Sequence, residues 1–103
     1  MVTKIVPDKV LGEITPLLKV ISSPLRLKIL NFLEEEEKAV FEIVGFTGAS
    51  QALVSHHLTI MRKNRVIRCR KEKNFIYYSI GNDYIYYFLE SIRTLKSSCP
   101  DKR

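Results

Sequence analysis

A helical segment that is followed at once by a β-hairpin restricts the fold of this chain more than any other feature. Three apolar residues of the segment 51–64 fall within about 60° of one another on a helical wheel, which predicts the core-facing stripe of an amphipathic helix. The stripe consists of Val54, Leu58 and Met61. From residue 66 the pattern changes to that of strands, and residues 75–80 are β-branched and aromatic. The polar run 71–74 predicts the hairpin turn.

The hairpin region carries the net charge of the whole chain. Residues 62–73 include seven basic residues and one acid, so this segment has a net charge of +6. The whole chain also has a formal net charge of +6, and the remaining residues therefore sum to zero. Such a concentration predicts a polyanionic partner, nucleic acid or an anionic membrane surface, with a merely solvated face as the alternative. A membrane surface is disfavoured because the charge lies on a hairpin and not on one long amphipathic helix.

The length of the chain sets its class. A chain of 103 residues forms about one domain and is too short for a large enzyme with a cofactor domain. A domain of this size buries only about 60–65% of its unfolded surface, so dimerisation would stabilise it. No apolar run approaches the ~20 residues of a membrane span, and the first eight residues do not resemble a signal peptide. With two cysteines, we expect a cytoplasmic protein without a disulfide framework.

Helical spacing begins well before the hairpin, in residues 8–21. Pro16 interrupts this segment, so either Thr15 and Pro16 begin a helix or a helix is kinked there. Ser23 as an N-cap, with Pro24 at the first helical position, predicts the start of a second and mostly buried helix.

The connection to the amphipathic helix contains a third, short helix from about residue 39 to residue 44. We expect Gly45 and Gly48 to form a tight turn after it, and Ser50 to cap the amphipathic helix. The acidic run 34–37 predicts a solvated helix end that points away from any phosphate surface.

The last predicted helix covers residues 83–99. Its apolar positions step by three and four residues: Ile85, Phe88, Ile92, Leu95 and Cys99. This spacing is typical of a seam between two helices, but two heptads are equally compatible with packing in the chain's own core. In the first case this helix pairs with its copy in a second chain.

This order of elements predicts a winged helix-turn-helix. Two helices joined by a short glycine-containing turn place the second helix in the major groove of DNA, and the hairpin at residues 66–80 is the wing. On the outer face of that second helix, Gln51 can bond an adenine edge, and Ser55 and His56 can donate or accept. His57 lies beside the core stripe, so we interpret it as a packing residue. The basic residues would hold phosphates and set the register.

Residues 50–58 read Ser-Gln-Ala-Leu-Val-Ser-His-His-Leu, and here the chain resembles the ArsR-type winged helix-turn-helix repressors. The likeness covers about residues 17–95. It implies a mainly α fold with a small β-hairpin, in the order α-α-α-α-β-β-α, and a homodimer that represses transcription from a palindromic operator in double-stranded DNA. We expect one domain over residues 1–103, with dimerisation helices at about 8–21 and 83–99, a helix-turn-helix at about 39–64 and a wing at about 66–80.

Three groups of site residues follow from the helical faces and from this resemblance. For the recognition helix, we expect DNA contacts from Ser50, Gln51, Ser55, His56, Thr59 and Lys63. For the DNA backbone and the wing, we expect contacts from Arg62, Arg65, Arg68, Arg70, Lys71, Lys73 and Asn74. For the dimer interface, we expect Leu11, Ile14, Leu18, Ile85, Phe88, Ile92 and Leu95.

The chain departs from the family at the ligands for metal sensing. Many members use Cys-x-Cys on the third helix, where residues 39–41 of this chain carry no thiolate or imidazole. On the last helix Asp83 remains, but Ile85 and Lys96 occupy two ligand positions and Cys99 a third. Because soft metal sites need several such ligands together, we expect no metal site and no cofactor.

A second departure is Arg65, which stands where the family usually has glycine after the recognition helix. We expect Asn64 to take the left-handed turn in its place.

The two cysteines leave a thiol- or redox-responsive repressor as an alternative. Relatives of that kind have one thiol near the position of Asn31 and another near the C-terminal end, like Cys99. Cys69 lies in the first wing strand between two arginines, which favours its thiolate form. Two unrelated thiols are the simpler interpretation.

Two further alternatives are a winged-helix module that binds protein and a small hydrolase. The concentrated charge argues against the first. The hydrolase would pair Cys69 with His56 or His57, but no third group is in evidence to orient the pair, so we expect no enzyme. The sequence does not specify an effector.

Overall fold

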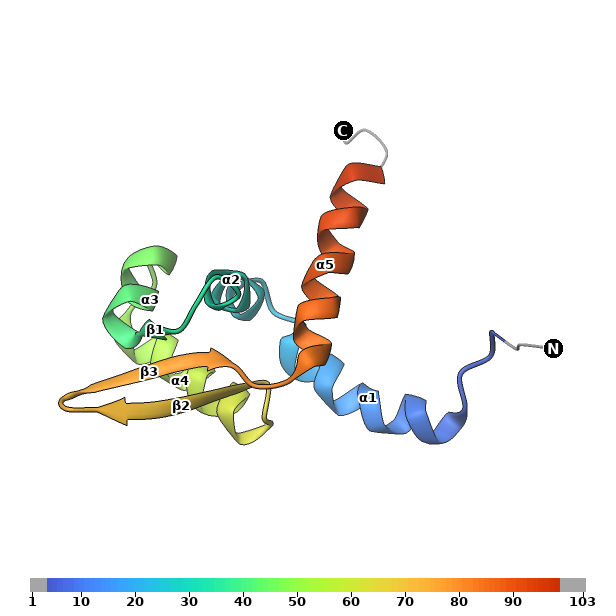
Figure 1. Ribbon diagram of the computed structural model, residues 1–103, viewed down its shortest axis with the longest axis horizontal. Helices are drawn as coiled ribbons and strands as arrows, with labels where there is room; N and C mark the ends of the chain where they lie inside the picture. The colour runs from blue at the N-terminus through green and yellow to red at the C-terminus, as the bar shows by residue number, and fades with distance from the viewer. Residues whose placement is uncertain (1–3, 99–103) are drawn as a thin grey trace.

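The computed structural model describes residues 4–98, and the side chains of residues 4–95. Its elements are, in chain order, α1 (Asp8–Ile21), α2 (Pro24–Leu33), β1 (Lys38–Ala39), α3 (Val40–Thr47), α4 (Gln51–Lys63), β2 (Ile67–Glu72), β3 (Phe75–Ile80) and α5 (Asp83–Ser98). Figure 1 shows α2, α3 and α4 gathered beside the sheet, with α1 extending away on the side opposite to the hairpin tip. The predicted order of helices and hairpin is therefore present, with one additional strand.

The sheet has three antiparallel strands in the order β1-β3-β2. The two-residue strand β1 was not predicted from the sequence; its Lys38 pairs with Tyr78, and its Ala39 with Tyr77. In the hairpin, β2 pairs with β3 along its whole length, from Ile67 opposite Ile80 to Glu72 opposite Phe75. Only residues 73 and 74 remain in the turn, which is therefore shorter than the predicted polar run 71–74.

The core lies where the helices meet the inner end of the hairpin. Its buried residues are Ile21, Ile29, Leu30, Leu33, Ile43, Val54, Leu58, Met61, Val66, Ile67, Ile80, Ile85 and Leu89. The predicted stripe of the amphipathic helix is fully buried here and is confirmed. Ile85 was predicted to line a dimer interface, and this prediction is wrong because its side chain is 0% exposed within a single chain.

Two helices run through residues that were expected to interrupt or end them. Helix α1 is continuous across Pro16, so no new helix begins there. Proline has no N–H to donate to the carbonyl of Gly12. One residue earlier, the hydroxyl of Thr15 donates to the carbonyl of Leu11 at 2.7 Å. Helix α3 includes Gly45, which we had placed in the turn. Gly48 alone ends it, with a φ of 74°.

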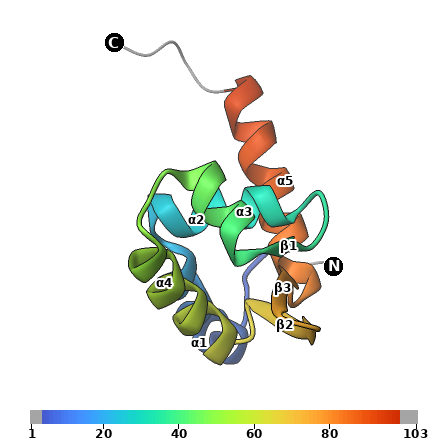
Figure 2. The same ribbon diagram turned by 90° about the vertical axis from the view of Figure 1, so that its left-hand side faces the viewer.

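Both serine caps are confirmed. The Ser23 hydroxyl accepts from the backbone N–H of Arg26 at 3.3 Å, and the Ser50 hydroxyl accepts from that of Leu53 at 3.1 Å. Figure 2 shows the consequence: α3 leads through a short loop into α4, and α4 lies along the outside of the molecule beside the hairpin. Among the described residues, no helix combines the length and the hydropathy that a membrane span requires.

Candidate nucleic-acid interface

The outer face of α4 is polar and open to solvent. Gln51, His56, Thr59 and Lys63 are exposed and Ser55 is half-buried. Two hydroxyls are already engaged within the helix, because Ser50 caps Leu53 and Thr59 donates to the carbonyl of Ser55 at 2.9 Å. The amide of Gln51 and the ring of His56 make no hydrogen bond to the part of the chain that the structure describes. These two side chains are therefore the most available for base edges.

His57 packs against the inner side of the same helix. Its Nδ1 accepts a hydrogen bond from Nε of Arg26 at 2.8 Å, and Nη1 of Arg26 donates to the carbonyl of Val20 at 2.8 Å. Burial lowers the pKa of His57, and the charges of Arg26 and His56 lower it further. His57 is therefore a neutral acceptor at pH 7 that links α4 to α2 and the end of α1, and its interpretation as a packing residue is confirmed.

The lowered pKa of His57 predicts that acid weakens the fold. In the unfolded chain the histidine has a pKa of about 6.5, and above that pH the contribution of His57 to the folding free energy is fully present. The contribution is lost as the pH falls below about 6.5, because the unfolded chain then binds a proton at His57 more readily than the folded chain does. We expect the denaturant midpoint to fall more between about pH 7.5 and about pH 5.5 in the wild type than in His57→Asn. The asparagine oxygen can accept from Arg26 without titrating. Equal falls in the two proteins would contradict this account.

On the wing, Arg70 is neutralised by carboxylates. Its Nε donates to Oε1 of Glu37 at 2.9 Å, further hydrogen bonds join its Nη atoms to Glu37 and Glu72, and its guanidinium stacks 4.9 Å from the ring centre of Tyr77. The hydrogen bond from Arg70 lowers the pKa of Glu37. The acidic run is thus not a simple solvated helix end, which corrects that prediction: one of its members is tied to the wing.

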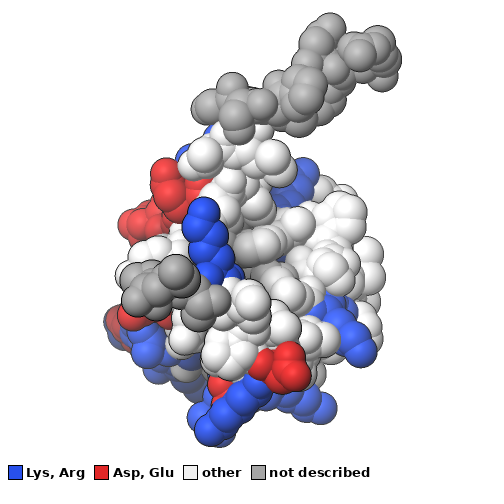
Figure 3. Space-filling view, turned by 90° about the vertical axis from the view of Figure 1, so that its right-hand side faces the viewer, with Lys and Arg blue, Asp and Glu red and all other residues white. Residues whose placement is uncertain are grey.

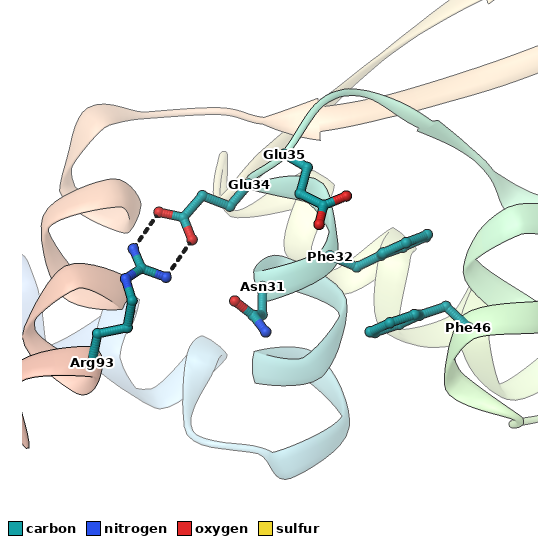
Figure 4. Close-up of a pocket in the computed structure, with 6 residues that line it drawn as sticks. All are labelled: Asn31, Phe32, Glu34, Glu35, Phe46 and Arg93. Carbon is teal, nitrogen blue, oxygen red and sulfur yellow. Dashed lines mark hydrogen bonds and ion pairs between the residues drawn. The ribbon is translucent and has the colours of Figure 1, made fainter. Parts of the chain in front are cut away.

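A second member of the acidic run is tied to α5. The carboxylate of Glu34 accepts from both Nη atoms of Arg93, at 2.9 and 2.7 Å, as Figure 4 shows. Beside this pair the rings of Phe32 and Phe46 stack with their centres 4.1 Å apart. The Glu34–Arg93 pair fixes α5 against the end of α2, and the ring stack joins α2 to α3.

The other predicted backbone contacts remain open. Within residues 4–95, none of the following has a carboxylate within ion-pair distance: Arg62, Arg65, Arg68, Lys71 and Lys73, nor has Lys63 of the recognition helix. They lie on the C-terminal end of α4, on the turn after it and on the wing, and Asn74 is exposed at the wing tip. Figure 3 shows blue side chains gathered along the lower edge of the molecule.

The turn after α4 differs from its prediction. Arg65 itself adopts the left-handed conformation, with a φ of 61°, whereas Asn64 has a φ of −96°. The backbone N–H of Arg65 donates to the carbonyl of Arg62 at 3.0 Å, and that of Val66 donates to Met61 at 2.9 Å. This paired pattern ends a helix by placing the second residue after it in the left-handed region, which fixes the position as Arg65.

Large hydrophobic side chains are exposed on α1, just before it and along α5. They are Val6, Val10, Leu11, Leu18, Tyr84, Tyr86, Tyr87, Ile92 and Leu95. Ile14 and Phe88, which were also predicted for the dimer interface, are half-buried. Most of the surface that faces the viewer in Figure 3 is uncharged.

Only one of the two cysteines lies within the described residues. Cys69 is exposed on β2, and Cys99 lies outside the described residues. Residues 4–98 contain no cluster of three His, Cys, Asp or Glu side chains that could hold a metal ion.

The comparisons with known proteins agree with this geometry. The family model "Bacterial regulatory protein, arsR family" matches residues 23–68. The chain is 28% identical to the arsenical resistance operon repressor of Staphylococcus xylosus, over 84% of this chain and 83% of the repressor. It is 36% identical to the transcriptional repressor SdpR of Bacillus subtilis, over 61% of this chain and 70% of SdpR. The crystal structure of NolR from Sinorhizobium fredii matches with a TM-score of 0.77 and 30% identity, over 91% of this chain and 96% of NolR.

Proposed function

The chain belongs to the ArsR family of bacterial regulatory proteins, and on this premise we propose that it represses transcription as a homodimer bound to a palindromic operator. Membership makes it a DNA-binding transcriptional regulator and not an enzyme. The observation that carries the finer proposal is the polar outer face of α4 beside a wing whose lysines have no carboxylate partner among the described residues. Such a protein acts in the cytoplasm, where the chromosome is.

The residues divide into three roles in this proposal. Gln51, Ser55 and His56 read base edges in the major groove, flanked by Ser50, Thr59 and Lys63. Backbone phosphates are contacted by Arg62, Arg65, Arg68, Lys71, Lys73 and Asn74. Arg70 is left out because Glu37 and Glu72 already satisfy its guanidinium. Helices α1 and α5 form the dimer, residues 39–64 the helix-turn-helix and residues 66–80 the wing.

The proposal is tested by selecting bound fragments from genomic DNA at a stated salt concentration. A homodimer with two recognition helices selects an inverted repeat whose half-sites lie about 34–36 Å apart, one helical turn of DNA. Affinity for the selected duplex falls steeply as salt rises, because bound phosphates release counterions. Selection of no duplex would contradict the proposal, and would favour a winged-helix module that binds protein.

Single substitutions separate the two kinds of DNA contact. Lys71→Ala is expected to weaken binding to operator and random duplexes alike, and to reduce the slope of log affinity against log salt by about 2, one contact being lost in each subunit of the dimer. Gln51→Ala and His56→Ala are expected to lower the preference for operator over random DNA by roughly 5- to 150-fold for each half-site, since a base contact contributes about 1–3 kcal/mol. Equal losses on both duplexes for all three variants would refute these roles.

We also propose that DNA release in this protein does not depend on a metal ion. The third helix has no thiolate or imidazole at residues 39–41, and zinc is held in proteins by several such groups together. Titration of the purified protein with zinc is expected to give no stoichiometric binding in the sub-micromolar range and no change in operator affinity. Tight binding of one ion per chain would overturn this.

A further inference from the structure

A hollow of about 340 Å³ lies where α4 ends and β2 begins. Its lining residues are Arg62, Arg65, Ile67, Arg68, Cys69 and Gly81. Half of these residues are arginines, and none is acidic. We refer to it as the arginine hollow.

The charge in the arginine hollow is not neutralised by the chain. Within the described residues, no carboxylate lies within ion-pair distance of Arg62, Arg65 or Arg68, whereas Arg70 and Arg93 each bind two carboxylates. Arg70 and Arg93 are thus compensated by carboxylates, whereas the three arginines of the hollow have none among the described residues. Guanidinium groups present several N–H donors in a planar fork, which suits the oxygens of a phosphate.

The pattern that ends α4 holds one of these arginines in the left-handed region. Arg65 has a φ of 61°, a conformation that costs a non-glycine residue about 1–2 kcal/mol. The carbonyl of Arg65 accepts from Nδ2 of Asn82 at 3.0 Å, and the carbonyl of Val66 accepts from the N–H of Gly81 at 2.9 Å. The turn is thus fixed on both sides. Strain that is held in this way is concentrated at functional sites.

The arginine hollow and the wing tip lie at opposite ends of α4. Gln51, at the first position of α4, lines a second hollow together with Asn74 and Phe75 of the wing tip. The arginine hollow begins at the last turn of the helix, about 20 Å away for a 13-residue helix. Contacts at both ends would fix the angle of the recognition helix in the groove, which contacts at the wing alone would leave free.

We propose that the arginine hollow is a seat for a single DNA backbone phosphate, which Arg62, Arg65 and Arg68 hold together. The inference rests on the proposed function, and it adds that three arginines act as one site on one phosphate of each half-site. The same chemistry would also accept a free phosphate ion, so the test below separates the two sources.

The test neutralises the phosphates of the selected operator one at a time by methylphosphonate substitution. We expect one position in each half-site to cost the wild-type protein about 10-fold in affinity and to cost Arg68→Gln clearly less, about 3-fold, because the variant has lost one of the three arginines that hold that phosphate. Equal profiles for the two proteins would overturn the proposal while leaving operator binding intact. Failure to select any operator would instead reject the proposed function.

The variant Arg65→Gly separates a loss of DNA affinity from a loss of folding stability. Glycine relieves the left-handed strain, so the thermal midpoint is expected to stay the same or rise while operator affinity falls about 10-fold. Arg70→Gln is the matched control, since it removes the same charge from the same strand as Arg68→Gln but from an arginine held by carboxylates. A loss in Arg70→Gln as large as that in Arg65→Gly would overturn the proposal.

The free-ion source is tested through Cys69, which lines the arginine hollow. In a Cys99→Ser background, operator DNA is expected to slow alkylation of Cys69 by about 10-fold or more, and inorganic phosphate is expected to have little effect beyond that of chloride at equal ionic strength. If phosphate protected Cys69 and the operator did not, the assignment to a DNA phosphate would be wrong.

Discussion

Replacement of Leu11 by glutamate is expected to leave a folded monomer that binds operator DNA at least ~100-fold more weakly than the wild type. Leu11 is 46% exposed in the single chain, so the change removes little from the core. In the proposed homodimer the same side chain is covered by the second copy. A two-fold interface would bury the new carboxylate twice, and a carboxylate without a partner is costly to remove from water.

The expected loss of DNA binding follows from the geometry of two half-sites. Once one recognition helix is bound, the second binds at a high effective concentration, and this linkage contributes about 10²- to 10⁴-fold. A monomer keeps all of its own contacts on α4 and the wing but loses the linkage. The loss in Leu11→Glu should therefore appear on duplexes with two half-sites and not on duplexes with one.

Lys9→Glu is the matched control for Leu11→Glu. Position 9 is also exposed on α1 but faces about 160° away from Leu11 on the helix. We expect this variant to remain a dimer by sedimentation velocity at micromolar concentration, and Leu11→Glu to sediment as a monomer with unchanged helix content. A Leu11→Glu protein that sediments as a dimer would place the subunit contact elsewhere on the surface.

Local rules predicted most of the fold. The serine caps and the stripe through Val54, Leu58 and Met61 each depend on residues within one or two helical turns, and all are found where the sequence placed them. The turn after α4 shows the limit of such rules. Asn64 was expected to take the left-handed conformation, whereas the hydrogen-bonding pattern of the helix end fixes Arg65 there.

Contacts between distant parts of the chain could not be predicted. Strand β1 has only two residues and forms by pairing with the edge of β3, so it is too short for a periodic sequence pattern to predict it. Glu37 and Arg70 are 33 positions apart, and their pairing engages the guanidinium of a residue that was predicted to contact DNA. Ile85 fits a seam and a core equally well by spacing, and only the packing of α5 against β3 and α2 decides between them.

Gly81→Ala is expected to cost about 2–3 kcal/mol of folding free energy and to lower the thermal midpoint by roughly 10–20 °C. A Cβ at this position would lie 2.8 Å from the carbonyl oxygen of Arg65 and 2.9 Å from the carbonyl carbon of Ile67. Gly81 is not among the residues with positive φ, so its conformational freedom is not the reason for glycine here. The reason is space, because the end of β3 packs directly on the backbone of the turn after α4.

Gly45→Ala provides the comparison. Gly45 lies inside α3, and a Cβ there would have nothing within 4 Å, so alanine is expected to raise stability by about 0.5–1 kcal/mol. The same chemical change should thus have opposite signs at the two glycines when thermal midpoints are measured. Equal effects would mean that backbone entropy, and not the crowded turn, determines the outcome.

The identity of the crowded atoms gives Gly81→Ala a further consequence. The contacts are with backbone atoms of Arg65 and Ile67, so shortening a neighbouring side chain cannot make room. Ile67→Val removes one buried methyl group and alone should cost about 1 kcal/mol. In the double variant we expect the two losses to add, or to exceed their sum, in chemical denaturation. Recovery of stability in the double variant would show that the Ile67 side chain, and not the backbone, excludes a larger residue at position 81.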